Sequence, residues 1–95
     1  MSVAHGVVDN VEFSRFERHG PHGELAVLEY KRSPGMLHLL STEVPASLEG
    51  QGYAGTLARW ALDFAAREGL GVGAVCPFVR AYLQKHPEFA HLVKY

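Results

Sequence analysis

The sequence is poor in cysteine. Cys76 is the one cysteine among 95 residues, so no disulfide can form within the chain. Disulfide scaffolds belong to oxidising compartments, whereas a chain that folds without them is typical of the cytoplasm. The single thiol therefore excludes a disulfide-stapled small protein and predicts a cytoplasmic location.

The sequence also lacks an excess of charge of either sign. Nine lysines and arginines stand against ten aspartates and glutamates, which gives a formal net charge of −1. Nucleic acids and anionic lipids attract proteins through a positive field, and this composition provides none. We therefore expect no nucleic-acid partner.

Long hydrophobic runs are absent as well. No apolar stretch approaches the ~20 residues that a membrane-spanning helix needs, and residues 1–10 lack the basic start and apolar run of a secretion signal. These absences predict a protein without a membrane span.

What the sequence does contain is enough apolar material for one thin core. Hydrophobic residues make up 47% of the chain and charged residues 20%. Compact domains mostly run from ~50 to ~200 residues, so residues 1–95 are predicted to form a single domain. Because small domains bury a modest share of their surface, a bound ligand or a partner chain is expected to supply part of the stability. We expect a monomer or a weak dimer.

Strand patterns dominate the first half of the chain. Residues 11–17 predict a strand, in which the spacing of two phenylalanines indicates a bulge. Turn formers then separate it from residues 24–30, and the pair predicts a hairpin. Residues 36–44 predict a third strand, which Pro45 ends because proline cannot donate a hydrogen bond to the ladder. Three antiparallel strands are expected.

The second half of the chain changes to helical spacing. Apolar residues recur at helical intervals from Tyr53 onward, and Gly69 ends this helix. Residues 70–76 predict a short buried parallel strand, and Pro77 opens a second helix that precedes a last turn at residues 89–93. The predicted order is β-β-β-α-β-α, an α+β fold in which antiparallel strands are followed by a strand-helix-strand crossover.

A glycine-rich loop precedes the long helix. Gly50, Gly52 and Gly55 stand close together, and so many glycines are costly in conformational entropy unless the backbone approaches something closely. A helix start leaves about four N–H groups without partners. None of Gly50, Gln51 and Gly52 has the short hydroxyl or carboxylate side chain that usually caps them. The arrangement predicts a phosphate-binding helix start. The alternative is a tight turn in which Ser47 caps the helix.

The residues of this loop resemble a known family. Glu49-Gly50-Gln51-Gly52-Tyr53-Ala54 is similar to the pyrophosphate-binding segment of the GNAT N-acetyltransferase superfamily, Gln/Arg-x-x-Gly-x-Gly/Ala. Three further motifs occur in the family's order at its spacing: Thr42-Glu43-Val44-Pro45, Cys76-Pro77-Phe78-Val79 and Tyr82-x-x-x-His86-Pro87-Glu88-Phe89. The resemblance covers residues 11–93 and implies a minimal, stand-alone GNAT-like fold.

The resemblance implies that acetyl-CoA is the co-substrate. Its pantetheine arm is expected beside Glu43, Val44 and Pro45 at the end of the third strand. Its pyrophosphate is expected to meet the main-chain amides of Gly50, Gln51, Gly52, Tyr53, Ala54 and Gly55.

Three roles must be filled for direct transfer of acetyl to an amine. An amine has a pKa of about 10, so a base must accept its proton, and an acid must protonate the leaving thiolate. The resemblance makes Glu43 the candidate base, directly or through water, and a backbone N–H near Val44 the oxyanion donor. Tyr82 is the candidate acid, because a phenol of pKa about 10 can protonate a nascent thiolate.

The sequence departs from the family pattern at three positions. Relatives commonly carry histidine at Ser41, proline at Ala74, and glutamine or arginine at Glu49. A carboxylate at Glu49 repels phosphate unless it turns away, and Ser41 removes one possible base. These departures keep open a second hypothesis, a catalytically weak CoA-binding or protein-interaction module.

Cys76 and His38 each have two possible interpretations. Cys76 offers a thiol at a helix start for an acetyl-cysteine intermediate, or it is a small buried hydrophobic residue. His38 reaches the acyl site or is structural. His19 and His22 have metal-ligand spacing but lie on a turn of glycine and proline, so we predict no metal.

The acceptor amine is left open by the sequence. A minimal domain with few loops has little material for an enclosed pocket. A protein, a polyamine and a small molecule are all compatible with the residues present.

Overall fold

The computed structural model describes residues 6–95 and shows one sheet with helices packed against it. The strands are β1 (Val7–Asn10), β2 (Arg15–His19), β3 (Leu25–Ser33), β4 (Met36–Glu43) and β5 (Gly71–Ala74). The helices are α1 (Tyr53–Glu68) and α2 (Pro77–Lys85), with short 3-10 helices η1 (Ala46–Leu48) and η2 (Pro87–Leu92).

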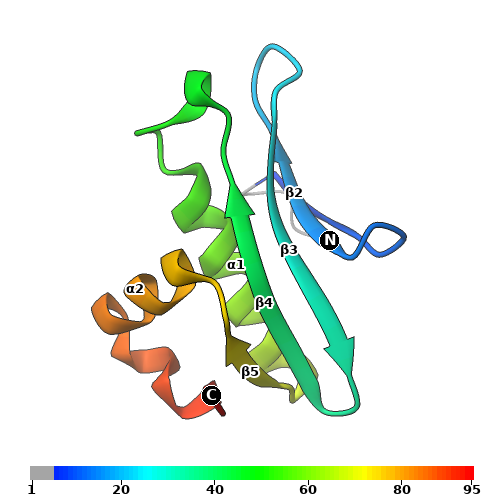
Figure 1. Cartoon of the computed structure of the whole chain (residues 1–95), viewed down its shortest axis with the longest axis vertical. Coiled ribbons are helices and arrows are strands. Elements are labelled where there is room, and N and C mark those ends of the chain that lie inside the picture. Colours follow the sequence, from blue (N-terminus) through cyan, green and yellow to red (C-terminus); the bar gives the residue numbers. More distant parts are fainter. Residues whose placement is uncertain (1–5) are drawn as a thin grey trace.

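The strands lie in chain order, β1-β2-β3-β4-β5. Neighbouring strands from β1 to β4 are antiparallel, and β4 and β5 are parallel. Helix α1 connects β4 to β5 by crossing one face of the sheet, as Figure 1 shows. The predicted α+β class and the strand-helix-strand crossover are confirmed.

The prediction of a strand over residues 11–17 is wrong in its bounds. Residues 7–10 form an additional strand, β1, and a turn over residues 11–14 leads into β2. The Asn10 Oδ1 accepts a hydrogen bond from the Phe13 N–H at 3.2 Å, and Ser14 takes a positive φ of 54°. Phe13 and Phe16 therefore belong to a turn and a strand rather than to one bulged strand, and the order is β-β-β-β-α-β-α.

The core lies between the sheet and α1. Phe16 of β2 is fully buried, and its ring centroid lies 5.1 Å from that of Trp60 and 5.6 Å from that of Phe64 on α1. Gly69 ends α1 in the left-handed conformation and donates its N–H to the carbonyls of Ala65 and Ala66, as the sequence predicts. This packing fixes α1, and hence its amino-terminal end, against the sheet.

An opening beside β4 positions the candidate site. Glu29 pairs with Ser41 and Tyr30 with Leu39, so Leu40 is an extra residue that bulges β4. Strand β5 pairs with β4 only from Met36 to Leu39. Beyond that point the β4 edge turned away from β3 has no neighbouring strand among residues 6–95.

The chain from β5 leaves the sheet at the same point. The Val75 and Cys76 N–H groups both donate to the Leu39 carbonyl, at 3.1 and 2.9 Å. Pro77 then opens α2 at its first position, as predicted. Strand β4 and helix α2 therefore diverge from Leu39 and leave room between them.

Candidate functional site

The loop before α1 is held open by two glycines in the left-handed conformation. Gly50 has a φ of 78° and Gly52 a φ of 84°, and L side chains rarely adopt these values. No atom lies within 4 Å of the position that a Cβ would take at either residue. Both glycines are therefore required by conformation, and both face open space.

Helix α1 begins without a side-chain cap. Gly52 occupies the N-cap position, and the first turn has no acidic residue. The Gln51 N–H donates to the Leu48 carbonyl at 3.3 Å. Within residues 6–95, five other N–H groups of the loop and first turn have no acceptor: those of Gly50, Gly52, Tyr53, Ala54 and Gly55. These amides form a donor cradle at the positive end of the helix dipole.

Ser47 does not cap the helix. Its Oγ donates to Glu24 Oε2 at 3.1 Å instead, and this bond ties η1 to the β2–β3 hairpin. The tight turn capped by Ser47, which the sequence left as the alternative, is therefore not what the structure shows.

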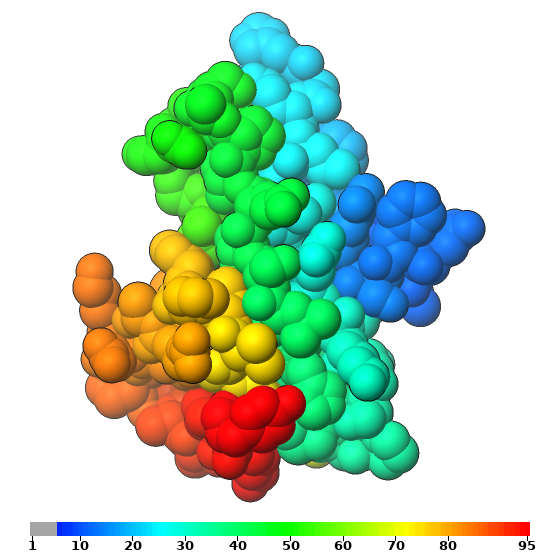
Figure 2. Space-filling model, in the orientation of Figure 1, coloured from blue at the N-terminus to red at the C-terminus, as the bar shows by residue number. Residues whose placement is uncertain are grey.

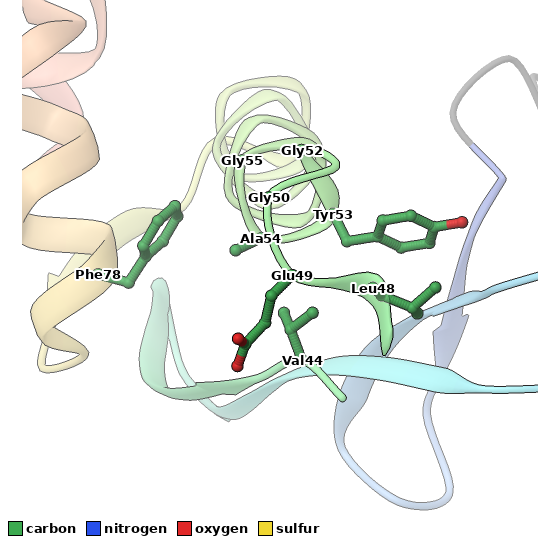
Figure 3. Close-up of a pocket in the computed structure, with 9 residues that line it drawn as sticks. All are labelled: Val44, Leu48, Glu49, Gly50, Gly52, Tyr53, Ala54, Gly55 and Phe78. Atoms are coloured by element: carbon green, nitrogen blue, oxygen red, sulfur yellow. The ribbon is translucent and has the colours of Figure 1, made fainter. Parts of the chain in front are cut away.

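A cavity of about 370 Å³ lies in front of this cradle (Figure 3). Six of the seven residues expected to bind the cofactor line its wall, and Gln51 is the exception. Leu48, Glu49 and Phe78 complete the wall. The lining residues are Val44, Leu48, Glu49, Gly50, Gly52, Tyr53, Ala54, Gly55 and Phe78.

The wall opposite the glycines comes from α2. The Phe78 ring faces the loop across the cavity (Figure 3), and this residue is 39% exposed. The sequence did not predict Phe78 as a site residue. Its place in the Cys76-Pro77-Phe78-Val79 motif is the signal that could have identified it.

Among residues 6–95, Glu49 is the one acidic residue in the wall. Its side chain extends toward Val44, away from Gly52 and Gly55 (Figure 3). Because charge repulsion falls with distance and with exposure to water, this orientation reduces the conflict between the carboxylate and an anion at the cradle.

Cys76 is buried, with 2% of its surface exposed. Its Sγ lies 3.2 Å from the Thr42 Oγ1, and this contact joins the start of α2 to the end of β4. The thiol does not line the cavity. The geometry therefore favours the packing role for Cys76 over the nucleophilic one.

Glu43 lies at the exposed end of β4, opposite Val27 of β3. Its neighbour Thr42 points toward the core side, where it meets Cys76. Successive side chains of a strand alternate between faces, so Glu43 projects from the face that α1 does not cover. Figure 2 shows that face, where β4 side chains reach the surface.

Tyr82 lies one helical turn beyond Phe78 on α2. Its Cε2 is 3.9 Å from the position of a Cβ built on Gly55, and its ring stacks on His86 with centroids 4.0 Å apart. The Tyr82 hydroxyl lies beside Arg59, and together with the Asp63 carboxylate it raises the pKa of that guanidinium. Tyr82 thus borders the start of α1 without lining the cavity.

Arg18 of β2 lies beside the candidate site, at a place that the sequence did not predict. Its Nη1 donates to the Thr56 Oγ1 at 3.0 Å, and its guanidinium carbon lies 4.0 Å from the centre of the Tyr53 ring. Arg18 and Thr56, which share this hydrogen bond, are 38 positions apart in the sequence. No local pattern predicts this contact, because the packing of α1 on the sheet creates it.

The three histidines considered in the sequence analysis, His38, His19 and His22, do not line the cavity. His38 bonds to the Ser33 Oγ at 2.9 Å and to the Tyr95 hydroxyl, so both ring nitrogens have protein partners. Within residues 6–95, neither His19 nor His22 belongs to a convergent group of three metal-ligating side chains.

The fold and the uncapped helix start define a class of protein. Residues 15–92 match the family model of the GCN5-related N-acetyltransferases, so the chain belongs to this family and its domain is of the acyltransferase type. Among curated proteins, the chain is 29% identical over 99 residues to Protein NATD1 of Xenopus tropicalis, covering 90% of this chain and 91% of that protein.

Two further relatives carry the same name. Protein NATD1 of Gallus gallus and of Homo sapiens are each 32% identical over 68 residues, which is 72% of this chain. The alignments span 62% and 60% of those two proteins.

No helix in the described part of the chain is both long and apolar enough to cross a bilayer. The cytoplasmic location stays a prediction.

Proposed function

We propose that this protein is an acetyl-CoA-dependent N-acetyltransferase that transfers acetyl directly to an amine. The observation that carries the proposal is the cradle of five first-turn and loop N–H groups that have no acceptor among residues 6–95 and face a cavity of about 370 Å³. The family to which the chain belongs is named for this activity.

The cradle suits the pyrophosphate of acetyl-CoA. The N–H groups at a helix start and the helix dipole both favour an anion there. The positive φ values of Gly50 and Gly52 turn the loop without placing a Cβ in the approach. The rest of the cavity wall is largely apolar, with Val44, Leu48 and Phe78, and an uncharged pantetheine arm suits such a surface.

Chemistry is proposed at the end of β4. The amine nitrogen forms a bond to the acetyl carbonyl carbon, and the carbon–sulfur bond of the thioester breaks. Glu43 accepts the amine proton, directly or through water, a Val44 N–H supports the oxyanion, and Tyr82 gives a proton to the departing thiolate. The products are an N-acetyl amine and CoA, and the enzyme is reset when Glu43 releases its proton to solvent and Tyr82 regains one from solvent.

Thermal melting with CoA and with acetyl-CoA tests the first half of the proposal. Binding to the folded state raises the melting temperature. An unchanged melting temperature with either compound at about 1 mM would contradict cofactor binding, because this concentration detects dissociation constants well below about 1 mM.

Release of free thiol in the presence of an amine panel tests the second half. Tyr82→Phe is expected to keep the melting shift and slow the transfer, whereas Cys76→Ala is expected to leave the rate unchanged because its thiol is buried away from the cavity. An acetylated Cys76 in the intact mass spectrum would contradict direct transfer.

A specific observation favours a second candidate, a CoA-binding or protein-interaction module that turns over little. Neither of the two proposed catalytic side chains, Glu43 and Tyr82, lines the cavity, and a carboxylate, Glu49, does. A melting shift without thiol release against any amine would support this candidate. The acceptor amine itself, whether protein, polyamine or small molecule, is to be identified by the same panel.

A further inference from the structure

Arg18 places a cation beside the start of α1. The guanidinium is held from two sides, by the hydrogen bond to the Thr56 Oγ1 at 3.0 Å and by the face of the Tyr53 ring at 4.0 Å. Tyr53 is the first residue of α1 and lines the cavity. The charge of Arg18 is therefore fixed on the sheet side of the first turn.

No carboxylate in the described part of the chain forms an ion pair with this guanidinium. Within residues 6–95 no Asp or Glu oxygen lies within 4 Å of Arg18, whereas Arg15 pairs with Glu17 at 2.5 Å. Residues 1–5 contain neither Asp nor Glu. Asp9 shares the core-side face of the neighbouring strand with Val7, the register partner of Arg18, but its Oδ1 accepts the Tyr30 hydroxyl at 2.7 Å.

A cation has the wrong sign for the amino-terminal end of a helix. That end carries about half a positive charge, and acidic groups are the ones it favours. The first turn of α1 has no acidic side chain and no cap. Arg18 thus adds its positive charge to the partial positive charge at the start of α1. An anion bound at the cradle would be attracted by both charges and would reduce the repulsion between them.

We propose that Arg18 is a specificity-determining residue, whose charge selects a diphosphate-bearing ligand for the cavity. The inference rests on the proposed function and concerns the same site. Arg18 acts over a distance, through the buried Tyr53 ring, on a diphosphate at the amides. Its effect is electrostatic and therefore depends on ionic strength.

The test is the affinity for CoA, measured by calorimetry at about 0.02 M and about 0.5 M salt, two conditions between which exposed charges pass from weak to strong screening. Arg18→Gln removes the charge. We expect it to bind CoA about fivefold more weakly at low salt, the effect of one charge several ångströms away in a polar medium. At high salt the difference from the wild type is expected to close.

Two variants serve as controls. Arg67→Gln makes the same change in net charge at the last turn of α1, about 20 Å along the helix at 1.5 Å per residue, and is expected to bind as the wild type does. Arg18→Lys keeps the charge but loses the planar group against Tyr53, and it is expected to bind CoA more tightly than Arg18→Gln does.

Three results would overturn the inference. The first is an Arg18→Gln variant that binds CoA like the wild type. The second is a deficit that persists unchanged at high salt, which identifies a structural role in holding the helix start. The third is an Arg18→Lys variant as weak as Arg18→Gln. Wild-type protein that binds no CoA at either salt concentration would overturn the proposed function itself.

Discussion

At the scale of single residues, backbone conformation distinguishes glycines that look alike in the sequence. Gly52 has a left-handed φ of 84°, whereas Gly55 lies in the first turn of α1 without a positive φ. A Cβ on Gly52 meets nothing within 4 Å, and one on Gly55 makes an ordinary contact with the Tyr82 ring at 3.9 Å. Conformation, rather than space, makes Gly52 the constrained position.

This difference predicts opposite effects of alanine. Gly52→Ala is expected to lower the free energy of unfolding by about 1–2 kcal/mol, because an L residue in the left-handed conformation is strained. Gly55→Ala is expected to be neutral or to raise it by up to about 1 kcal/mol, since alanine favours a helix over glycine. Urea denaturation of the two variants measures both. Equal losses of stability would show that the φ values do not govern these positions.

The carboxyl of Glu17 is expected to make the free energy of unfolding depend on pH. Burial by itself raises the pKa of this carboxyl, but hydrogen bonds from Arg15 and Asn10 and the charges of Arg15 and His19 outweigh it and hold the pKa below its ordinary 4.5. The folded state therefore gains stability above pH 4.5 and loses it as the pH falls through the lowered folded pKa.

Glu17→Gln is expected to reduce the free energy of unfolding by about 1–2 kcal/mol at pH 7, the ordinary cost of losing a charged hydrogen bond. The deficit is expected to shrink as the pH falls below 4.5. Urea denaturation across the pH range measures it. A deficit that stays constant down to pH 3 would place its origin in packing rather than in the charge.

At the scale of elements, the site depends on how β4 and α2 separate. The extra residue Leu40 bends β4, and the Leu39 carbonyl takes the last bonds from the β5 side. Helix α2 then supplies a cavity wall through Phe78 and a contact to α1 through Tyr82. The two elements act as the sides of one opening, with the amides of α1 at its end.

Phe78 and Phe89 provide a matched pair for this arrangement. Phe78 is 39% exposed in the cavity wall, whereas Phe89 of η2 is 6% exposed in the core. Phe78→Ala is expected to weaken CoA binding about tenfold with a stability loss below ~1 kcal/mol, because its ring faces the cavity rather than the core. Phe89→Ala is expected to cost about 3 kcal/mol in stability. Calorimetry and urea denaturation separate the two effects.

At the scale of the whole molecule, the core and the site lie at different parts of the same helix. Helix α1 buries Leu57, Ala58, Ala61 and Leu62 against the sheet, while its amino-terminal amides face the cavity. A ligand that binds the cavity in the native state alone is therefore expected to stabilise the fold as a whole.

Hydrogen exchange tests this view across the chain. The Gly50, Gly52, Tyr53, Ala54 and Gly55 amides are expected to exchange quickly without ligand and slowly with CoA, because a diphosphate becomes their acceptor. The interior amides of α1, such as that of Ala61, are expected to be slow in both states. The expectation would be wrong if CoA slowed the α1 interior and left the loop amides unchanged.

The sequence alone determined the two helices, the parallel step and the glycine loop, but it missed β1. Helical spacing, Gly69 and Pro77 are local signals, because they reflect the backbone preferences of the residues themselves. The motif around Gly52 likewise gave the family before the fold was known. The turn at residues 11–14 escaped prediction, since two phenylalanines at strand-like intervals outweighed the Asn10 side chain that shapes the turn.

Only the tertiary structure decided what surrounds the helix start. Whether Ser47 caps α1, which way Glu49 turns and which cation stands beside Tyr53 all depend on elements distant in the sequence. Such contacts arise from packing one element on another, and no periodicity within a strand or helix encodes them. The sequence specified a glycine loop at the start of α1, and the packing of the sheet against α1 placed Arg18 beside that start.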